Sequence, residues 1–199
     1  MGGVRYLLHK DKGVTSAFLT EIITTAVAGK AVVIPDYVTL SGRKYPVTHI
    51  RAEAFKGKNI TSVKLPSTLK EIRNATFRDT PITEITIPAS VDIIQGSAFY
   101  GCKKLKTLTI PRSVVKIAES AFANSGIVEL DVSSVKEFES GCFSGCTSLK
   151  ALKFNASLKN DFVSEIYLET GINECPFLQV KYENNQYVIP SGITFVNGK

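Results

Sequence analysis

The sequence of 199 residues predicts a mostly β repeat solenoid, in which one coil of about 22 residues stacks on copies of itself. Three observations predict this class. Phenylalanine recurs at a nearly constant spacing, a phrase of alternating apolar residues follows each phenylalanine, and proline often closes that phrase. Because several independent markers keep the same period, the repeat outweighs local propensities along the chain.

The phenylalanines mark the period most clearly. They are separated by 22, 22, 23 and 21 residues, and each ends a phrase such as Ile94-Gln-Gly-Ser-Ala-Phe99. Stacking places a repeat position above the same position in the next coil. We therefore expect the five rings to form a buried row, in preference to an aromatic stripe for a ligand. They are Phe55, Phe77, Phe99, Phe122 and Phe143.

A second phrase begins five or six residues after each phenylalanine and predicts the strand of the coil. Its first, fourth and sixth residues are apolar, and the fourth and sixth alternate with polar neighbours, as in a strand with one buried face. Pro66, Pro88 and Pro111 follow directly, where a residue without an N–H suits the end of a strand. The rest of the coil leaves room for a short helical or 3-10 turn near each Ala-Phe pair. We interpret Gly96, Gly101, Gly126 and Gly145 as turn glycines.

The phrase is similar to that of the BspA-like, or treponemal-type, leucine-rich repeats. Ile87-Pro88-Ala89-Ser90-Val91 and its continuation through Ala98-Phe99, Gly101-Cys102 and Leu105 follow the family pattern. The resemblance covers residues 31–158, with Cys142 in place of the usual alanine and Ser133 and Asn155 in place of proline. It implies a right-handed leucine-rich-repeat coil. It also implies a surface or secreted protein of a host-associated microbe, used for adhesion to host proteins or to other cells.

We interpret residues 1–199 as a single domain, with five repeats over 50–158 between two caps. In the N-terminal cap and lead-in, 1–50, Arg5–His9 and Thr15–Ile22 predict a β-hairpin. A helix over Thr15–Ala28 is the alternative, and the β-branched residues favour the hairpin. Ala31–Val38 and Lys44–Ile50 predict a second strand pair. In the C-terminal cap, 159–199, Leu178, Val180 and Tyr182 predict a last strand that turns at Asn184-Asn185.

The cysteines and histidines do not form a catalytic or metal-binding pattern. Cys102 and Cys146 share one repeat position two coils apart, so their Cα atoms should lie about 10 Å apart, beyond the reach of a disulfide. A Cys142–Cys146 pairing stays open, and buried free thiols are the simpler interpretation. His9 and His49 both fall in the N-terminal cap. We expect a chain that is not an enzyme and holds no cofactor or metal.

The strand residues that point away from the core should line the concave side of the solenoid. Their side chains are mixed in charge and poor in aromatic rings. Glu129 and Asp131 beside Glu84 could hold a cation, although a solvated acidic face is the simpler interpretation. We take this face as the first candidate for binding a partner protein. Its residues are Ser62, Lys64, Glu84, Thr86, Thr107, Thr109, Glu129, Asp131, Ala151 and Lys153.

A basic ridge on one flank is the second candidate surface. Its residues follow the phenylalanines of the first three coils: Lys56, Lys58, Arg78, Lys103 and Lys104. Together with the net charge of +6, a ridge suits an acidic protein or a sulfated glycan. Solvated lysines that prevent edge aggregation are the alternative. No aromatic stacking platform accompanies the ridge, so nucleic acid is not expected.

These observations predict a monomeric, non-enzymatic protein-binding module. By resemblance, it is part of a microbial adhesin at the cell surface or secreted. The alternatives are a passive ectodomain spacer and an intracellular scaffold, because one solenoid serves many functions. No apolar run approaches the roughly 18 residues of a membrane span, and the first residues contain no signal-peptide core.

Overall fold

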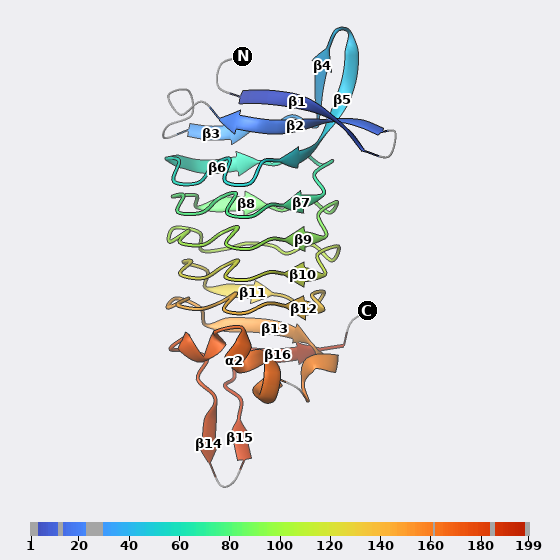
Figure 1. Ribbon diagram of the computed structural model, residues 1–199. Coiled ribbons are helices and arrows are strands. Elements are labelled where there is room, and N and C mark those ends of the chain that lie inside the picture. The colour runs from blue at the N-terminus through green and yellow to red at the C-terminus, as the bar shows by residue number, and fades with distance from the viewer. Residues whose placement is uncertain (1–3, 12–13, 23–29, 161, 184–185, 198–199) are drawn as a thin grey trace.

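The computed structural model describes residues 4–11, 14–22, 30–160, 162–183 and 186–197. Coils of the chain stack one below another, between an end made of strands and an end that carries short helices (Figure 1). The expected turns at Lys12-Gly13 and Asn184-Asn185 lie outside the described residues.

Antiparallel strands cover the N-terminal end of the stack. β1 (Val4–Asp11) pairs with β2 (Val14–Ile22), which confirms the first hairpin and excludes a helix over residues 15–22. Residues 23–28 of the alternative helix lie among those not described. β2 runs parallel to β5 (Arg43–Ile50), and β5 pairs with β4 (Tyr37–Leu40) to give the order β1-β2-β5-β4. The second hairpin is therefore shorter than predicted, since residues 31–33 leave it.

The phrase predicted as the strand of each coil builds parallel strands along the stack, which form two three-stranded sheets. β3 (Lys30–Val33) starts the first of them, so residues 31–33 extend a repeat sheet instead of the hairpin. Pro35 follows β3 and separates it from β4. In the third coil, pairing is reduced to one bridge between Thr86 and Thr109. The other strands are β6 (Ile60–Lys64), β8 (Glu84–Thr86), β11 (Glu129–Asp131), β13 (Ala151–Asn155) and β16 (Ile193–Val196). We call their outward side the strand face.

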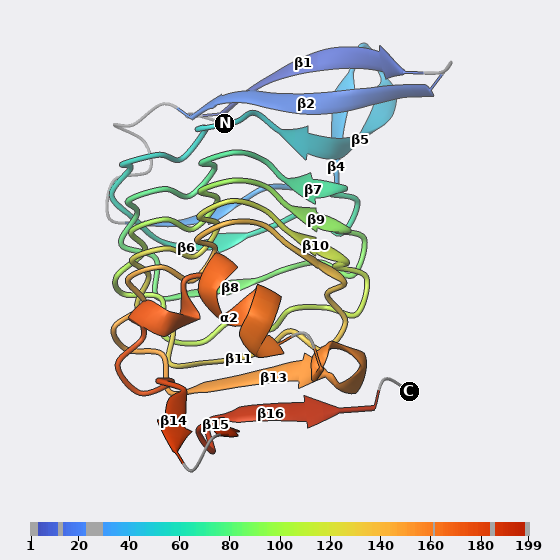
Figure 2. The same cartoon turned by 60° about the horizontal axis from the view of Figure 1, so that its bottom comes forward.

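Another parallel sheet, which the sequence did not predict, lies on the other side of the coils (Figure 2). Its strands have two residues each, and the second residue is the apolar one that opens each phenylalanine phrase. An alternation of two residues is too short to indicate a strand in the sequence. The strands are β7 (Glu71–Ile72), β9 (Ile93–Ile94), β10 (Lys116–Ile117) and β12 (Glu137–Phe138).

Tight turns, and not a helix, surround each Ala-Phe pair. Between residues 50 and 155, all of which the structure describes, the chain forms strands and turns without a helical or 3-10 segment. Two positions of the coil have positive φ, as in Ser97 (54°) and Gly101 (67°). A left-handed residue every four positions cannot continue a right-handed helical turn, so the expected helical turn is wrong. The turns bond to the next coil instead, since the Phe99 N–H donates to the Ala121 carbonyl at 2.7 Å.

The phenylalanines form the predicted row in the centre of the coils. Neighbouring rings stack with centroids 5.2, 5.4, 5.4 and 6.1 Å apart from Phe55 to Phe143. All five side chains are at most 1% exposed. This confirms the row as core and excludes a ligand stripe.

The coil pattern continues past residue 158, where we expected the C-terminal cap to begin. The Cys175 N–H donates to the Ile172 carbonyl, and the Leu178 N–H donates to the Cys175 carbonyl. In the third coil, the Cys102 N–H donates to the Phe99 carbonyl and the Leu105 N–H to the Cys102 carbonyl in the same way. Ile172, Cys175 and Leu178 thus take the phenylalanine, cysteine and leucine positions of a sixth coil. The short helices before them are η1 (Ala156–Leu158), η2 (Phe162–Ile166, π-helical), α2 (Tyr167–Glu169) and η3 (Ile172–Glu174).

A hairpin interrupts this sixth coil before its strand. β14 (Lys181–Glu183) pairs antiparallel with β15 (Gln186–Val188), and β16 then closes the coil against β13. The predicted last strand therefore begins at Lys181 and not at Leu178, which is buried in the core. The helical insertion and the hairpin lengthen the coil, so its markers no longer keep the period in the sequence.

Candidate binding surface

The strand face presents two columns of outward side chains because neighbouring coils pair in register. Ser62 lies opposite Glu84, and Asp131 lies opposite Lys153. The alternate residues point inward and are at most 8% exposed: Val63, Ile85, Leu108, Leu130 and Leu152. The first column contains Ser62, Glu84, Thr107, Glu129 and Ala151, and the second contains Lys64, Thr86, Thr109, Asp131 and Lys153.

All ten of these residues line one trough along the strand face. Two hollows make up the trough, and both are bounded by Thr107, Leu108 and Thr109, where they meet. Side chains with hydroxyl groups extend the second hollow beyond the predicted set, among them Ser133 and Thr194. The surface that the alternation selected is therefore hollowed, and side chains with hydroxyl groups and charges line it together with apolar ones.

The acidic end of the trough is held by an ion pair. Lys153 Nζ lies 2.7 Å from Asp131 Oδ2, and the Ser133 N–H and hydroxyl donate to Asp131 Oδ1 at 3.0 and 2.6 Å. Partial burial acts to raise the pKa of Asp131, but the bonds from Lys153 and Ser133 outweigh it and leave the pKa below its ordinary value. Asp131 is therefore charged and already compensated. Among the residues described, no group of three or more His, Cys, Asp or Glu side chains is placed to hold a metal ion.

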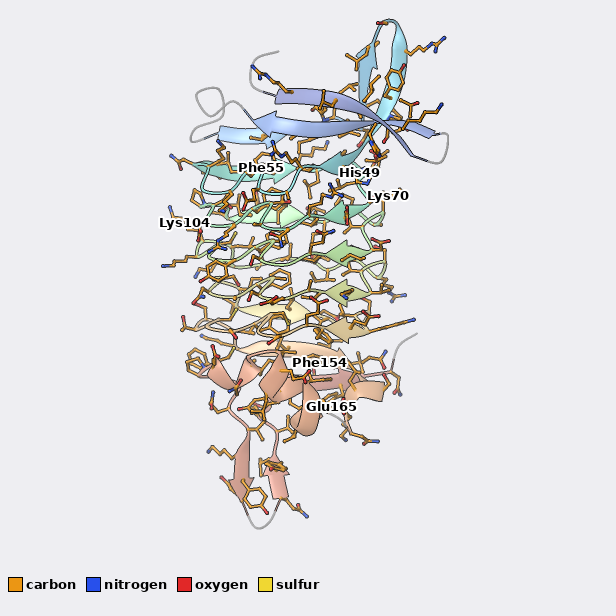
Figure 3. The ribbon with its side chains drawn as sticks, in the orientation of Figure 1. His49, Phe55, Lys70, Lys104, Phe154 and Glu165 are labelled. Carbon is orange, nitrogen blue, oxygen red and sulfur yellow. The ribbon has the colours of Figure 1, made fainter. Side chains whose placement is uncertain are left out.

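The five basic residues of the predicted ridge lie in different environments. Lys56 Nζ contacts Glu53 Oε1 at 2.7 Å, and this bond and charge lower the pKa of Glu53. Arg78 pairs with Asp79 at 3.3 Å. Lys58 is half-buried, whereas Lys103 and Lys104 are exposed. Figure 3 shows Lys104 at the outer edge of the stack, away from Lys70 on the opposite edge.

Arg78 also stacks on an aromatic ring. Its guanidinium carbon lies 4.4 Å from the ring centroid of Tyr100 in the next coil. The carboxylate of Asp79 and this ring orient the cation within the flank. Two of the five ridge charges, on Lys56 and Arg78, are thus engaged inside the chain, and the exposed basic pair is Lys103 with Lys104.

The cysteines are part of the core. Cys102, Cys142, Cys146 and Cys175 are free and buried. The Cys102 thiol donates to the Phe77 carbonyl at 3.0 Å, and burial raises its pKa to about 11. A thiol with a raised pKa is a poor nucleophile at neutral pH. His49 lies at the end of β5 with Nδ1 2.8 Å from Thr48 Oγ1, in the N-terminal cap and remote from the cysteine positions of coils three, five and six.

An aromatic pair at the C-terminal end was missed in the sequence. Tyr182 and Tyr187 face each other across the β14–β15 hairpin with ring centroids 5.1 Å apart, and they are 63% and 61% exposed. The hairpin projects beyond the last coil (Figure 1). Tyrosines placed symmetrically about Asn184-Asn185 were the available signal. This signal was overlooked because the last strand was expected to begin at Leu178.

A family profile decides the relationship of the chain to known proteins. The BspA type leucine rich repeat region matches residues 70–189 in six copies, which is more than half of the sequence. The chain belongs to the BspA-type leucine-rich repeat family. This confirms the resemblance of the repeat phrase, and the match extends beyond the five repeats seen in the sequence.

Solved structures support the same BspA-type fold. A leucine-rich repeat protein from Bacteroides ovatus is 28% identical over 77% of this chain and 46% of its own, with a TM-score of 0.61. The T. pallidum leucine-rich repeat protein is 26% identical over 75% of this chain and 68% of its own (0.66). The pneumococcal vaccine antigen PcpA is 25% identical over 76% of this chain and 48% of its own, with a TM-score of 0.61. This BspA-type chain thus spans about half the length of two of these relatives. No curated protein matches it.

None of the helices in the described residues is long and apolar enough to cross a bilayer.

Proposed function

We propose that the chain is a non-enzymatic protein-binding module, part of a microbial cell-surface or secreted adhesin, and that the trough on the strand face is its docking surface. One observation carries this proposal: ten outward residues from five coils line two adjoining hollows, which share Thr107, Leu108 and Thr109. A surface made continuous by repetition suits an extended protein partner. One structural relative is named a vaccine antigen, which fits exposure at a cell surface.

The chemistry of the trough favours a polar partner. Threonines occupy its centre, and Lys64, Glu84 and Glu129 place both signs of charge beside them. Such a surface combines hydrogen-bonding groups and charges of both signs with apolar area between them, so it suits a protein surface more than a small apolar ligand.

We expect large side chains at the centre of the trough to abolish binding. The variant Thr107→Arg with Thr109→Arg places two guanidinium groups where the two hollows meet. Both threonines are exposed, so the fold should tolerate the change. Biolayer interferometry measures the affinity for host extracellular-matrix proteins. This affinity should fall at least about tenfold, which corresponds to a loss of roughly 1.4 kcal/mol of binding free energy.

The matched control lies on the ridge. Lys103→Ser with Lys104→Ser removes two exposed charges and leaves the trough unchanged, so affinity for a protein partner should stay the same. The ridge is the second candidate site, for a sulfated glycan, because these two lysines are adjacent and exposed. If only this variant loses binding, and if salt weakens binding by the wild type, the ridge is the binding site. If the wild type binds neither class, the spacer interpretation replaces the proposal.

A further inference from the structure

One position of the coil forms a ladder of small side chains along the stack. It lies three residues after the phenylalanine position, and from the second coil to the fifth it holds Thr80, Cys102, Ser125 and Cys146. Side chains from neighbouring coils meet there. Thr80 Oγ1 lies 3.5 Å from Cys102 Sγ, and Ser125 Oγ lies 3.5 Å from Cys146 Sγ. In these two pairs, side chains one coil apart place their γ atoms in direct contact.

Cys175 occupies the next position of the ladder, one coil beyond Cys146. Its thiol donates to the Phe143 carbonyl at 3.5 Å, as the Cys146 thiol donates to the Phe122 carbonyl at 3.0 Å. The Cys175 sulfur also lies near the backbone N–H of Cys146, as the Cys146 sulfur lies near that of Ser125. Cys175 therefore has the same backbone neighbours in the fifth coil that Cys146 has in the fourth, and Cys146 is the cysteine beside it on the ladder.

The sixth coil packs closely enough for a covalent link. The Phe143 N–H donates to the Thr170 carbonyl at 2.8 Å. A Cβ on Gly171 would fall 2.7 Å from the Cα of Ser144, so the two backbones touch beside this position. Hydrogen-bonded neighbouring chains lie about 4.8 Å apart, and the Cα atoms of a disulfide usually lie about 4.4–6.8 Å apart. Cys146 and Cys175 belong to such neighbouring chains, whereas Cys102 and Cys146 are two coils apart.

We propose that Cys146 and Cys175 form a disulfide in oxidising surroundings, which staples the sixth coil to the fifth. The two thiols lose two protons and two electrons to a disulfide oxidant such as oxidised glutathione. The reaction passes through a mixed disulfide and releases two molecules of reduced glutathione. Neither a binding partner nor the trough takes part, so this inference stands apart from the proposed function.

Burial determines when the bond forms. Cys146 and Cys175 are 1% and 0% exposed, and burial raises the pKa of Cys175 to about 12. The reduced folded chain therefore reacts slowly with an oxidant. The bond forms during folding or when the terminal coil opens, since the ends of a repeat array open more easily than its centre.

Cys142 is the competing thiol. It is buried at the position held by Ala98 and Ala121 in other coils, and its charged form would be repelled by both Cys146 and Cys175. Cys142→Ala removes this competitor and restores the residue that the repeat uses elsewhere.

The test is to refold the protein with reduced and oxidised glutathione, digest it without reduction and identify linked peptides by mass spectrometry. A Cys146–Cys175 peptide is expected in the wild type and in Cys142→Ala. It should be retained in Cys102→Ser, which alters the same ladder where no cysteine is adjacent, and lost in Cys175→Ser. Ser125 shows that the ladder accepts serine, so these variants should fold. A link through Cys142, or no link, overturns the proposal.

A calibrating variant tests the ladder geometry itself. Thr80→Cys places a thiol beside Cys102, and the introduced thiol should cross-link to Cys102 under the same conditions. If this pair links and the Cys146–Cys175 pair does not, the placement of the sixth coil is wrong and the proposal fails.

Hydrogen exchange tests the staple. Amide exchange in residues 162–178 should be at least about tenfold slower in the oxidised than in the reduced wild type, because a cross-link restricts opening of the terminal coil. Cys175→Ser should show no redox difference. A disulfide that leaves exchange unchanged would contradict the stapling role.

Discussion

Phe99→Ala is expected to lower the free energy of unfolding by about 3–5 kcal/mol. The Phe99 ring is fully buried and stacks between Phe77 and Phe122, with 5.4 Å between centroids on both sides. Truncation removes its hydrophobic contribution and leaves a cavity that spans two coil interfaces. The backbone is fixed there by bonds from coil to coil, so the cavity cannot collapse. Urea denaturation followed by circular dichroism measures the loss.

Two variants serve as controls for this result. Phe99→Leu keeps most of the volume and should cost less than about 1.5 kcal/mol. Phe177→Ala makes the same truncation at a ring that is 54% exposed and contacts Lys150 at 5.1 Å, so it should cost less than about 1 kcal/mol. A loss below about 1 kcal/mol for Phe99→Ala would contradict its place in the core.

The features that the sequence predicted are those that recur in every coil. The phenylalanine position and the strand phrase each recur five times in the sequence, so one irregular coil does not obscure either pattern. The outward columns followed from the same alternation, and all ten residues do line the trough. The part of the trough contributed by Thr194 was not predicted because β16 follows an insertion that breaks the period.

Conformations set by contacts between coils could not be predicted. Glu53, Ala75, Ser97 and Ser120 have positive φ, although none of these residue types favours it. Hydrogen bonds across the stack stabilise them, since the Ala75 N–H donates to the Gly96 carbonyl at 2.9 Å. The pairing of Arg78 with Asp79 and Tyr100 likewise depends on side-chain geometry that a sequence pattern does not contain.

The glycines divide into two kinds that the sequence does not distinguish. Gly101 and Gly145 have φ of 67° and 66°, as expected for turn glycines. Gly96 also lies in a turn, without a positive φ, whereas Gly126 lies outside the turns, so the interpretation of Gly126 as a turn glycine is wrong. A Cβ on Gly126 would lie 2.1 Å from the Lys103 carbonyl oxygen of the preceding coil. Gly126 is required because the third and fourth coils approach each other closely at this point.

Gly126→Ala is therefore expected to destabilise the chain by about 2–3 kcal/mol. The added methyl group meets a backbone carbonyl and not a flexible side chain, so the coils must separate. Separation strains the bond from the Gly126 N–H to the Cys102 carbonyl, 3.1 Å long, and the bond from Val128 to Lys106 beside it. The midpoint and slope of urea denaturation give the change in free energy.

The control is a glycine that needs its conformation but has open space. Gly57 has φ of 64° with no atom within 4 Å of an added Cβ, and Asn124 holds the same position in another coil with φ of 56°. Gly57→Asn should therefore change stability by less than about 1 kcal/mol, because asparagine tolerates the left-handed region. The contrast between the two variants separates close packing of coils from backbone conformation. Equal and small effects would show that the third and fourth coils do not approach as closely at Gly126 as the structure places them.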